Sequence, residues 1–230
     1  LNADGTLTVH ADPEDETVNF TYEVTSSDGH TDVGFVTLHV VPCFVAGSRV
    51  ATPAGPRPVE TLMPGDLVLT KDAGPQPLRW IGRRTVPAEG RFAPIRFDTG
   101  AHGATRPLLV SPQHRVLVRD PAAELLFGEA EVLVAAKDLV DGRAVRVVAG
   151  GTVEYVHLLF DRHHILFAEG MASESFLPGP QVLGAMEAAV QAEICALFPE
   201  LDPETGAGYG PAARRSLRTF EARLLQGRAA

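Results

Sequence analysis

The sequence predicts a mainly β protein whose last part is helical. From residue 43 to about 177, short apolar runs such as L-V-L-T, R-V-L-V and A-V-R-V-V alternate with Gly, Pro and Asp turns. The first 42 residues show strand-like alternation of a different composition, and helical spacing appears only after about residue 178. We therefore divide the chain into residues 1–42, 43–177 and 178–230.

Residues 1–42 are predicted to be the end of a truncated β-sandwich. The runs T-L-T-V-H, V-N-F-T-Y-E-V-T and G-F-V-T-L-H-V-V alternate as strands do, and S-S-D-G-H forms a turn between the last two. Three strands cannot close a sandwich. The ending F-T-Y-E-V-T followed by D-G resembles the last strands of bacterial cadherin-like repeats, which implies that a longer module of that kind precedes residue 43.

Residues 43–177 contain an internal echo. Val59, Leu62, Gly65 and Val68 recur 77 positions later as the set Ala136, Leu139, Gly142 and Val145. A duplicated β half-domain with pseudo-two-fold symmetry would give such a match. Chance would also give it in a β protein, because the pattern L-x-x-G-x-x-V is common.

Residues 178–230 are predicted to form two helices. Q-V-L-G-A-M-E-A-A-V-Q-A-E-I-C-A-L-F has helical spacing and ends before Pro199. D-P-E-T-G-A-G-Y-G is a loop, and P-A-A-R-R-S-L-R-T-F-E-A-R-L-L is a second helix that begins with proline. We expect this extension to pack against the β domain and to take no part in catalysis.

Charge and composition restrict the partners. The net charge of −9 and the pI near 5.3 disfavour nucleic acid. No apolar run approaches the length of a membrane span, and no secretory signal peptide is visible. The chain begins at Leu1 within a strand-like pattern, so we expect it to be a piece of a longer protein. An export signal would then lie upstream, and we expect an extracellular or cell-surface location.

The two cysteines differ in their surroundings. Cys195 lies in the helical run A-E-I-C-A-L-F and is predicted to be a buried core thiol. Cys43 lies between Pro42 and Phe44, at the boundary between two kinds of sequence. It is either a core cysteine at the start of a strand or a nucleophile, and a nucleophilic thiol needs a base nearby.

Five motifs resemble those of Hint domains, the self-processing modules shared by hedgehog proteins and inteins. They occur in the family's order, and the likeness is greatest to the bacterial Hint branch. The motifs are C-F-V-A-G-S-R-V-A-T, P-V-E-T-L-M-P-G-D-L-V-L-T, R-W-I-G-R-R, S-P-Q-H-R-V-L-V and H-L-L-F-D-R-H-H-I-L-F-A-E-G-M-A-S-E-S-F. The resemblance covers about residues 43–177 and implies an all-β, pseudo-symmetric Hint-type fold.

The resemblance implies a reaction of the chain on itself. The sulfur of Cys43 would attack the carbonyl carbon of Pro42, giving a thioester and a free amine at Cys43. His114 matches the histidine of the family's T-x-x-H motif, which protonates the departing nitrogen. Ser111 stands where the family more often has threonine, and its hydroxyl can still hold the scissile amide or the oxyanion. Without the resemblance, S-P-Q-H would be interpreted as a plain turn.

A second histidine cluster provides further candidates. The intein pattern H-x-x-x-A-x-G fits His164, the D-R-H pattern of the bacterial branch fits His163, and His157 precedes both. Asp161 lies between them and could orient an imidazole. One histidine is expected to act on the tetrahedral intermediate. Such clusters also bind zinc, but the Cys or acidic partners are not suitably spaced, so we expect no metal and no cofactor.

The fate of the thioester follows from what the sequence lacks. Intein splicing needs an asparagine at the end of the domain, and this chain has only Asn2 and Asn19, both before Cys43. We therefore expect single-turnover cleavage by water, a small nucleophile or an acceptor amine. The substrate is the chain's own upstream part, which is released.

Two alternatives remain open at this stage. One is an adhesion or calcium-binding surface protein with a degenerate Hint domain, which the acidic run A-D-P-E-D-E and Ser111 favour. The other is a Cys–His protease that acts on other proteins. Cys43 opens a strand-like run, whereas thiol proteases usually place the nucleophile at a helix start, where the dipole lowers its pKa.

Overall fold

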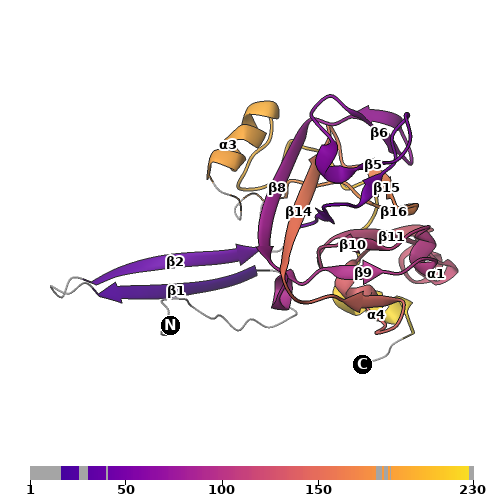
Figure 1. Ribbon diagram of the computed structural model, residues 1–230, viewed down its shortest axis with the longest axis horizontal. Helices are drawn as coiled ribbons and strands as arrows, with labels where there is room; N and C mark the ends of the chain where they lie inside the picture. The colour runs from indigo at the N-terminus through magenta and orange to yellow at the C-terminus, as the bar shows by residue number, and fades with distance from the viewer. Residues whose placement is uncertain are drawn as a thin grey trace.

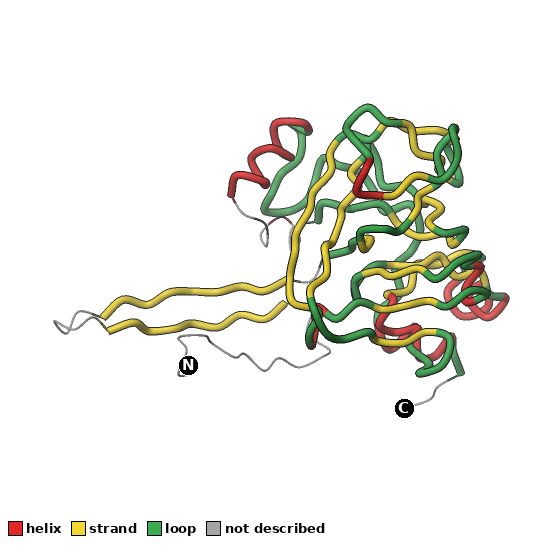
Figure 2. The backbone as a smooth tube through the Cα atoms, in the orientation of Figure 1, coloured by secondary structure: helices red, strands yellow, loops and turns green. Residues whose placement is uncertain are grey.

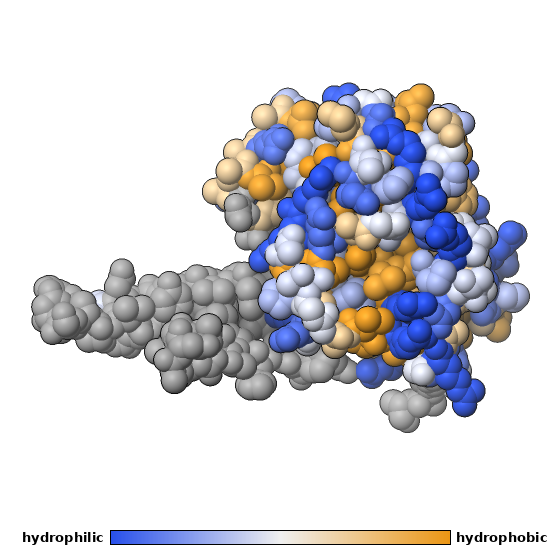
Figure 3. Space-filling view, viewed as in Figure 1, coloured by the Kyte–Doolittle hydropathy of each residue, from blue (hydrophilic) through white to orange (hydrophobic). Residues whose placement is uncertain are grey.

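The computed structural model describes residues 17–25, 31–39, 41–179, 183, 186 and 188–227. Most described residues outside the C-terminal part lie in strands or in the turns between them, as the alternating pattern predicts (Figures 1 and 2). The face shown in Figure 3 has hydrophilic side chains around the rim of the domain and hydrophobic ones near its centre. The predicted mainly β fold with C-terminal helices is confirmed.

The upstream segment forms a hairpin. Strands β1 (Thr17–Thr25) and β2 (Thr31–His39) pair antiparallel and extend away from the rest of the molecule (Figure 1). The strand predicted at residues 6–10 and the turn at residues 26–30 lie outside the described residues. The cadherin-like character of residues 1–42 therefore stays a prediction.

Two sheets build the domain that follows. The six-stranded sheet has the order β13-β9-β10-β3-β14-β8. Its members are β3 (Phe44–Val45), β8 (Trp80–Pro87), β9 (Ile95–Phe97), β10 (Leu108–Val110), β13 (Val145–Val147) and β14 (Thr152–Leu159). The short strand β3 is thus a central strand, held between β10 and β14. Because β3 begins one residue after Cys43, the six-stranded sheet fixes the position of that residue.

The second sheet follows the path β12-β11-β16-β15-β4-β5, and β6 joins it by pairing with β15 and β7. Its strands are β4 (Arg49–Val50), β5 (Arg57–Pro58), β6 (Leu67–Thr70), β7 (Gly74–Pro77), β11 (Arg115–Arg119), β12 (Glu131–Ala135), β15 (Ile165–Ala168) and β16 (Met171–Glu174). Side chains from both sheets share one buried cluster, which includes Phe44, Phe97, Val116 and Leu166. The two sheets therefore enclose a common core.

The internal echo corresponds to matching local structure. The 3₁₀ turn Val59–Thr61 in the first copy has its counterpart in Ala136–Leu139 of the second. Gly65 and Gly142 both have positive φ, 93° and 72°, which only glycine adopts readily. The valines that close the two patterns lie buried in β6 and β13. The match is thus structural and is not a coincidence of common residues. Two further 3₁₀ turns are Gly90–Phe92 and Ala101–Gly103.

The helices differ from the prediction in two places. The second C-terminal helix, α4 (Thr219–Leu225), begins eight positions after Pro211, because Ser216 bridges to Leu133 of β12 and residues 211–218 form no helix. The prediction of a helix from Pro211 is wrong, since this sheet contact outweighs local helix propensity. Helix α1 (Pro121–Phe127) was not expected, because seven residues are too few to show helical spacing.

The C-terminal part packs against the β domain as expected. Helix α3 (Ala188–Leu197) contributes Ile194 to a buried cluster that also contains Trp80, Leu159 and Phe176. Leu217 and Ala222 join the main core, and the hydroxyl of Tyr209 donates to the carbonyl of Phe160 at 2.7 Å. None of the described helices is both long and apolar enough to span a membrane.

Candidate active site

The bond between Pro42 and Cys43 lies inside the protein, at the entrance to β3. The residues on both sides of it are buried, and Cys43 is 3% exposed. Phe44 and Val45 pair with β14, and Phe44 also pairs with β10. Strands far apart in sequence therefore bring their side chains to this one peptide bond.

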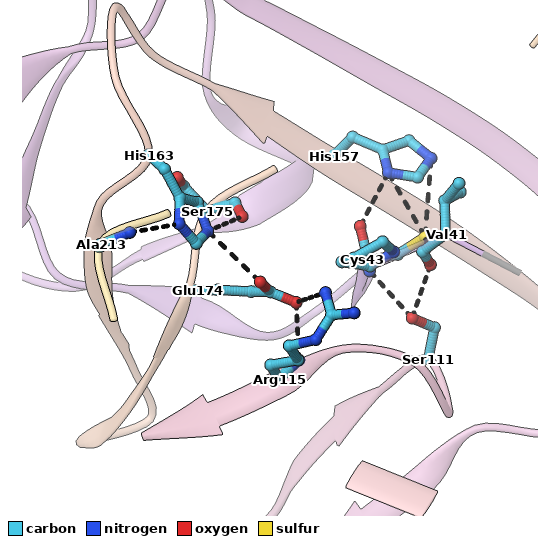
Figure 4. Close-up of polar contacts among 10 residues, drawn as sticks. Val41, Cys43, Ser111, Arg115, His157, His163, Glu174, Ser175 and Ala213 are labelled. Atoms are coloured by element: carbon cyan, nitrogen blue, oxygen red, sulfur yellow. Dashed lines mark hydrogen bonds and ion pairs between the residues drawn. The ribbon is translucent and has the colours of Figure 1, made fainter. Parts of the chain in front are cut away.

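Ser111, the residue directly after β10, holds the chain on both sides of this bond. Its hydroxyl oxygen accepts from the backbone N–H of Cys43 at 2.9 Å and donates to the carbonyl of Val41 at 2.8 Å. Its own N–H donates to the carbonyl of Cys43 at 3.0 Å. Ser111 is fully buried. These three hydrogen bonds fix the peptide unit that contains the Pro42 carbonyl and the peptide units on either side of it, and Figure 4 shows the two that the hydroxyl makes.

His157 of β14 contacts both the carbonyl and the sulfur. Its Nδ1 lies 2.9 Å from the oxygen of Pro42, and because a carbonyl only accepts, Nδ1 carries the proton. The Cys43 sulfur lies 3.4 Å from Nδ1 and 3.6 Å from Nε2, and it donates to the carbonyl of Val41 at 3.0 Å. Figure 4 shows the imidazole of His157 beside Cys43. The nitrogen without the proton, Nε2, is thus the nearest basic atom to the thiol.

Aromatic side chains hold the His157 ring in place. In the β14–β8 ladder His157 pairs with Gly82. A Cβ on Gly82 would lie 2.1 Å from the Trp80 ring, so the ring occupies the space that the glycine leaves. That ring stacks on His157 at 6.4 Å between centroids, and Phe176 meets His157 edge-on at 5.3 Å. The R-W-I-G motif therefore supports the imidazole from one side.

Burial keeps both reacting groups neutral. It raises the pKa of the Cys43 thiol far above its ordinary value, although Ser111 and Arg84 act in the opposite direction. It lowers the pKa of His157 to about 4, against the raising effect of the Pro42 carbonyl. At neutral pH the site therefore holds a thiol and an uncharged imidazole, not a thiolate–imidazolium pair.

His114 lies beside the site, and its ring forms no hydrogen bond to the site. The backbone N–H of His114 donates to the carbonyl of Ser111 at 3.0 Å, and the imidazole ring meets Phe44 edge-on with 4.5 Å between ring centroids. Within the described part of the chain neither ring nitrogen has a partner, although the side chain is buried. Burial lowers its pKa to about 4, with Glu174 opposing. A buried imidazole without partners is costly, which is typical of a functional group.

His163 belongs to a separate buried group. Its Nδ1 accepts from the N–H of Ala213 at 2.9 Å, so Nε2 carries the proton and faces the carbonyl of Ser175 at 3.1 Å and Glu174 at 3.3 Å. The other oxygen of Glu174 accepts from the Arg115 backbone at 2.9 Å and lies 3.5 Å from its guanidinium.

Burial alone would raise the pKa of Glu174, but Arg115 and His163 outweigh that effect and hold it below its ordinary value. Figure 4 shows this group apart from the Cys43 group. Its partners tie the C-terminal part to the β domain, and they do not touch the Pro42–Cys43 bond.

The remaining two predicted residues do not contact the bond. The ring of His164 packs edge-on against Phe160, with 5.9 Å between ring centroids, and the backbone N–H of His164 donates to the Ser175 hydroxyl. Asp161 forms an exposed ion pair with Arg79 at 3.2 Å, so the expectation that it orients an imidazole is not met. Among the described residues, no three His, Cys, Asp or Glu side chains are grouped as a metal site requires.

We predict that Gly82→Ala raises the pKa of His157 from about 4 towards the ordinary 6.5. The added methyl group displaces the Trp80 ring and exposes the imidazole to water. Histidine titration by NMR measures the change. Gly179→Ala is the matched control, because its Cβ would meet no atom within 4 Å. An unchanged His157 pKa in Gly82→Ala would show that Trp80 does not shield the ring.

The chain matches one protein-family model and is similar to several solved structures. The family model of the Hint domain matches residues 42–180. Among solved structures, the chain is similar to the bacterial intein-like domain from Clostridium thermocellum, with 14% identity and a TM-score of 0.39 over 57% of this chain and 96% of that one. It is also similar to a splice-inactive variant of the AceL NrdHF class 3 split intein, with 18% identity and a TM-score of 0.41 over 58% and 97% of the two chains.

No curated protein matches the chain. The Hint match nevertheless spans more than half of its length and begins at Pro42, one residue before the cysteine of the candidate site. The chain belongs to the Hint domain family.

Proposed function

We propose that this Hint domain cleaves its own chain at the Pro42–Cys43 bond through a thioester. Membership of the family supports a self-processing role in general. The observation that carries the specific proposal is the set of contacts around this one bond. Ser111 binds its nitrogen, His157 binds its carbonyl oxygen, and the sulfur of the residue that supplies the nitrogen lies against His157.

The first step is attack of the Cys43 sulfur on the carbonyl carbon of Pro42. The thiol proton moves to Nε2 of His157, and the Nδ1–H of the same ring stabilises the negative charge that develops on the Pro42 oxygen. Holding the thiol next to its target within one residue can supply roughly 7–11 kcal/mol of the barrier. Neither a helix dipole nor a preformed thiolate is therefore required.

The second step breaks the bond between the Pro42 carbon and the Cys43 nitrogen. The electron pair stays on the nitrogen, which takes up one proton and becomes an amine. Ser111 binds the N–H of this nitrogen and holds it in place. The buried His114 ring follows Ser111 in the same turn, so we assign the protonation to His114, once it has received the proton held by His157. The proton that the amine gains is the one that the thiol gave to Nε2 of His157, passed on through His114. The shift from amide to thioester is therefore balanced, and both histidines end as they began.

The thioester is then cleaved by water or another nucleophile, which releases the upstream chain. Asn2 and Asn19 both precede Cys43, so residues 43–230 contain no asparagine that could complete a splicing reaction. The released part would include the β1–β2 hairpin, which we propose belongs to a cadherin-like module exported from the cell. Burial of Cys43 argues against a protease that acts on other proteins, because a foreign peptide could not reach the sulfur.

Removing the sulfur should abolish cleavage. In wild type, intact mass at neutral pH should show a product of residues 1–42, formed faster with added thiol, whereas Cys43→Ala should stay whole. The rate should not change on dilution, because the reaction is intramolecular. A wild-type chain that remains intact with thiol would contradict the proposal and favour a degenerate domain. A rate that rises with protein concentration would favour a protease acting between molecules.

The rate of thioester formation should be level between about pH 5.5 and 8, without the usual histidine inflection. His157 and His114 have a pKa of about 4, and the Cys43 pKa is raised, so none of the three titrates in this range. The rate should fall as pH approaches 4, when His157 becomes protonated and cannot accept the thiol proton.

Cleavage is followed by mass at thiol concentrations high enough that the rate no longer depends on thiol. An inflection near pH 6.5 would show that the histidine on the reaction path is not one of the two buried residues.

A further inference from the structure

A small pocket lies directly beside the candidate scissile bond. About 280 Å3 of space free of protein atoms lies in the pocket and in front of its mouth, and this figure includes open solvent. Cys43, Ser111 and His157 form one side of it, and Val86, Phe92 and Tyr155 belong to the rest of its lining. A molecule in the pocket would therefore meet the same side chains that hold the Pro42 carbonyl.

The strand register explains which residues surround the pocket. Along β8, the positions Gly82, Arg84 and Val86 face the same side of the sheet, and their partners on β14 are His157, Tyr155 and Val153. Arg84 is thus the next residue after Gly82 on this side of β8, and Gly82 is the partner of His157, whose imidazole contacts Cys43. Its backbone position is fixed by a ladder of eight residue pairs between β8 and β14.

Arg84 gives the pocket a positive charge. It is exposed and lines the pocket, and among the described residues no carboxylate lines the pocket with it. Within the part of the chain that the structure describes, Arg84 forms no ion pair. The hydroxyl of Tyr155, opposite Arg84, already donates to the carbonyl of Phe92 at 2.7 Å. The guanidinium is therefore available to an anion that enters from solvent.

We propose that this pocket binds the nucleophile that resolves the thioester, and that Arg84 selects small thiols or amines carrying an acidic group. The inference rests on the self-cleavage proposed above. The apolar lining from Val86 and Phe92 suits a short carbon stem, and the guanidinium pairs with a carboxylate or sulfonate at its end. The limited space excludes large acceptors from this pocket.

The chemistry at this site is an acyl transfer. For a thiol, a bond forms between its sulfur and the Pro42 carbonyl carbon, and the bond from that carbon to the Cys43 sulfur breaks. The proton of the incoming thiol passes to the departing Cys43 sulfur, with His157 in contact with that sulfur. Cys43 is regenerated as a thiol and the upstream chain leaves as a new thioester. This exchange of one thioester for another needs no oxidant and no metal.

The test uses three thiols that share a two-carbon stem and end in an anionic, a neutral or a cationic group. They are 2-mercaptoethanesulfonate, 2-mercaptoethanol and 2-aminoethanethiol, each compared in wild type and Arg84→Gln. The ratio of wild-type to variant rate cancels the intrinsic reactivity of each thiol. We expect Arg84→Gln to slow the sulfonate by about fivefold more than the neutral thiol, and to speed the aminothiol relative to it. High salt should shrink the sulfonate effect.

Arg83→Gln is the matched control, because Arg83 is the next residue of β8 and its guanidinium donates to the carbonyl of Glu60. It should change the three rates equally, and Arg84→Lys should keep the preference for the sulfonate. Equal slowing of all three thiols by Arg84→Gln would overturn the proposal and leave self-cleavage intact, because that result places Arg84 in the first step only. If no thiol cleaves wild type, self-cleavage itself fails and this inference fails with it.

Discussion

The rest of the site depends on the two hydrogen bonds of the Ser111 hydroxyl. The hydroxyl accepts from the N–H of Cys43 and donates to the carbonyl of Val41, so one oxygen holds the residues before and after Pro42. This places the Pro42 carbonyl in a single orientation, in which its oxygen meets the Nδ1 of His157. Without the hydroxyl, the buried N–H of Cys43 would lose its partner, which typically costs about 1–3 kcal/mol.

The fold places this hydroxyl by means of long-range pairing. Ser111 follows β10 and His157 lies within β14, and both strands flank the two-residue strand that begins at Phe44. The short strand has too few hydrogen bonds to hold its own position, so its neighbours determine where Cys43 lies. The buried group of His163, Glu174 and Arg115 has a different task, because it fastens the C-terminal part through Ala213. The histidines of the last motif are therefore divided between a candidate catalytic role and a structural one.

Much of this arrangement was predictable from the sequence where the signal is local. Alternating runs indicated strands, and the repeated L-x-x-G-x-x-V pattern marked two equivalent turns whose glycines need positive φ. The motif order identified Cys43, Ser111 and His114. Helix α1 was missed although Asp120 caps it and Gly128 ends it, because those signals are short. The prediction of a helix from Pro211 was wrong, because the bridge between Ser216 and Leu133 of β12 keeps the first half of that segment out of a helix.

The choice among His157, His163 and His164 could not be made from sequence, because it depends on register. His157 reaches the sulfur only because β14 pairs with β3 and with β8 in one particular alignment, and a shift by one residue would turn the ring to the other face. The proposed role of Arg84 in the pocket could not be predicted from the sequence for the same reason. Its motif was recognised, but its place beside the pocket follows from its pairing with Tyr155.

The most direct test of the thioester uses the chain's only Pro–Cys pair. Cys43 follows Pro42 and Cys195 follows Ile194, so labelling proline at its carbonyl with ¹³C and cysteine with ¹⁵N gives one coupled ¹³C–¹⁵N peptide signal. On addition of thiol, our account predicts that this signal disappears while an uncoupled carbonyl signal appears in the thioester region of the spectrum. The Cys43→Ala variant, labelled in the same way, is the control. Its labelled prolines serve as the reference, and it should show no thioester signal. Loss of the coupled signal with direct growth of a carboxylate, or its persistence in wild type, would contradict the account.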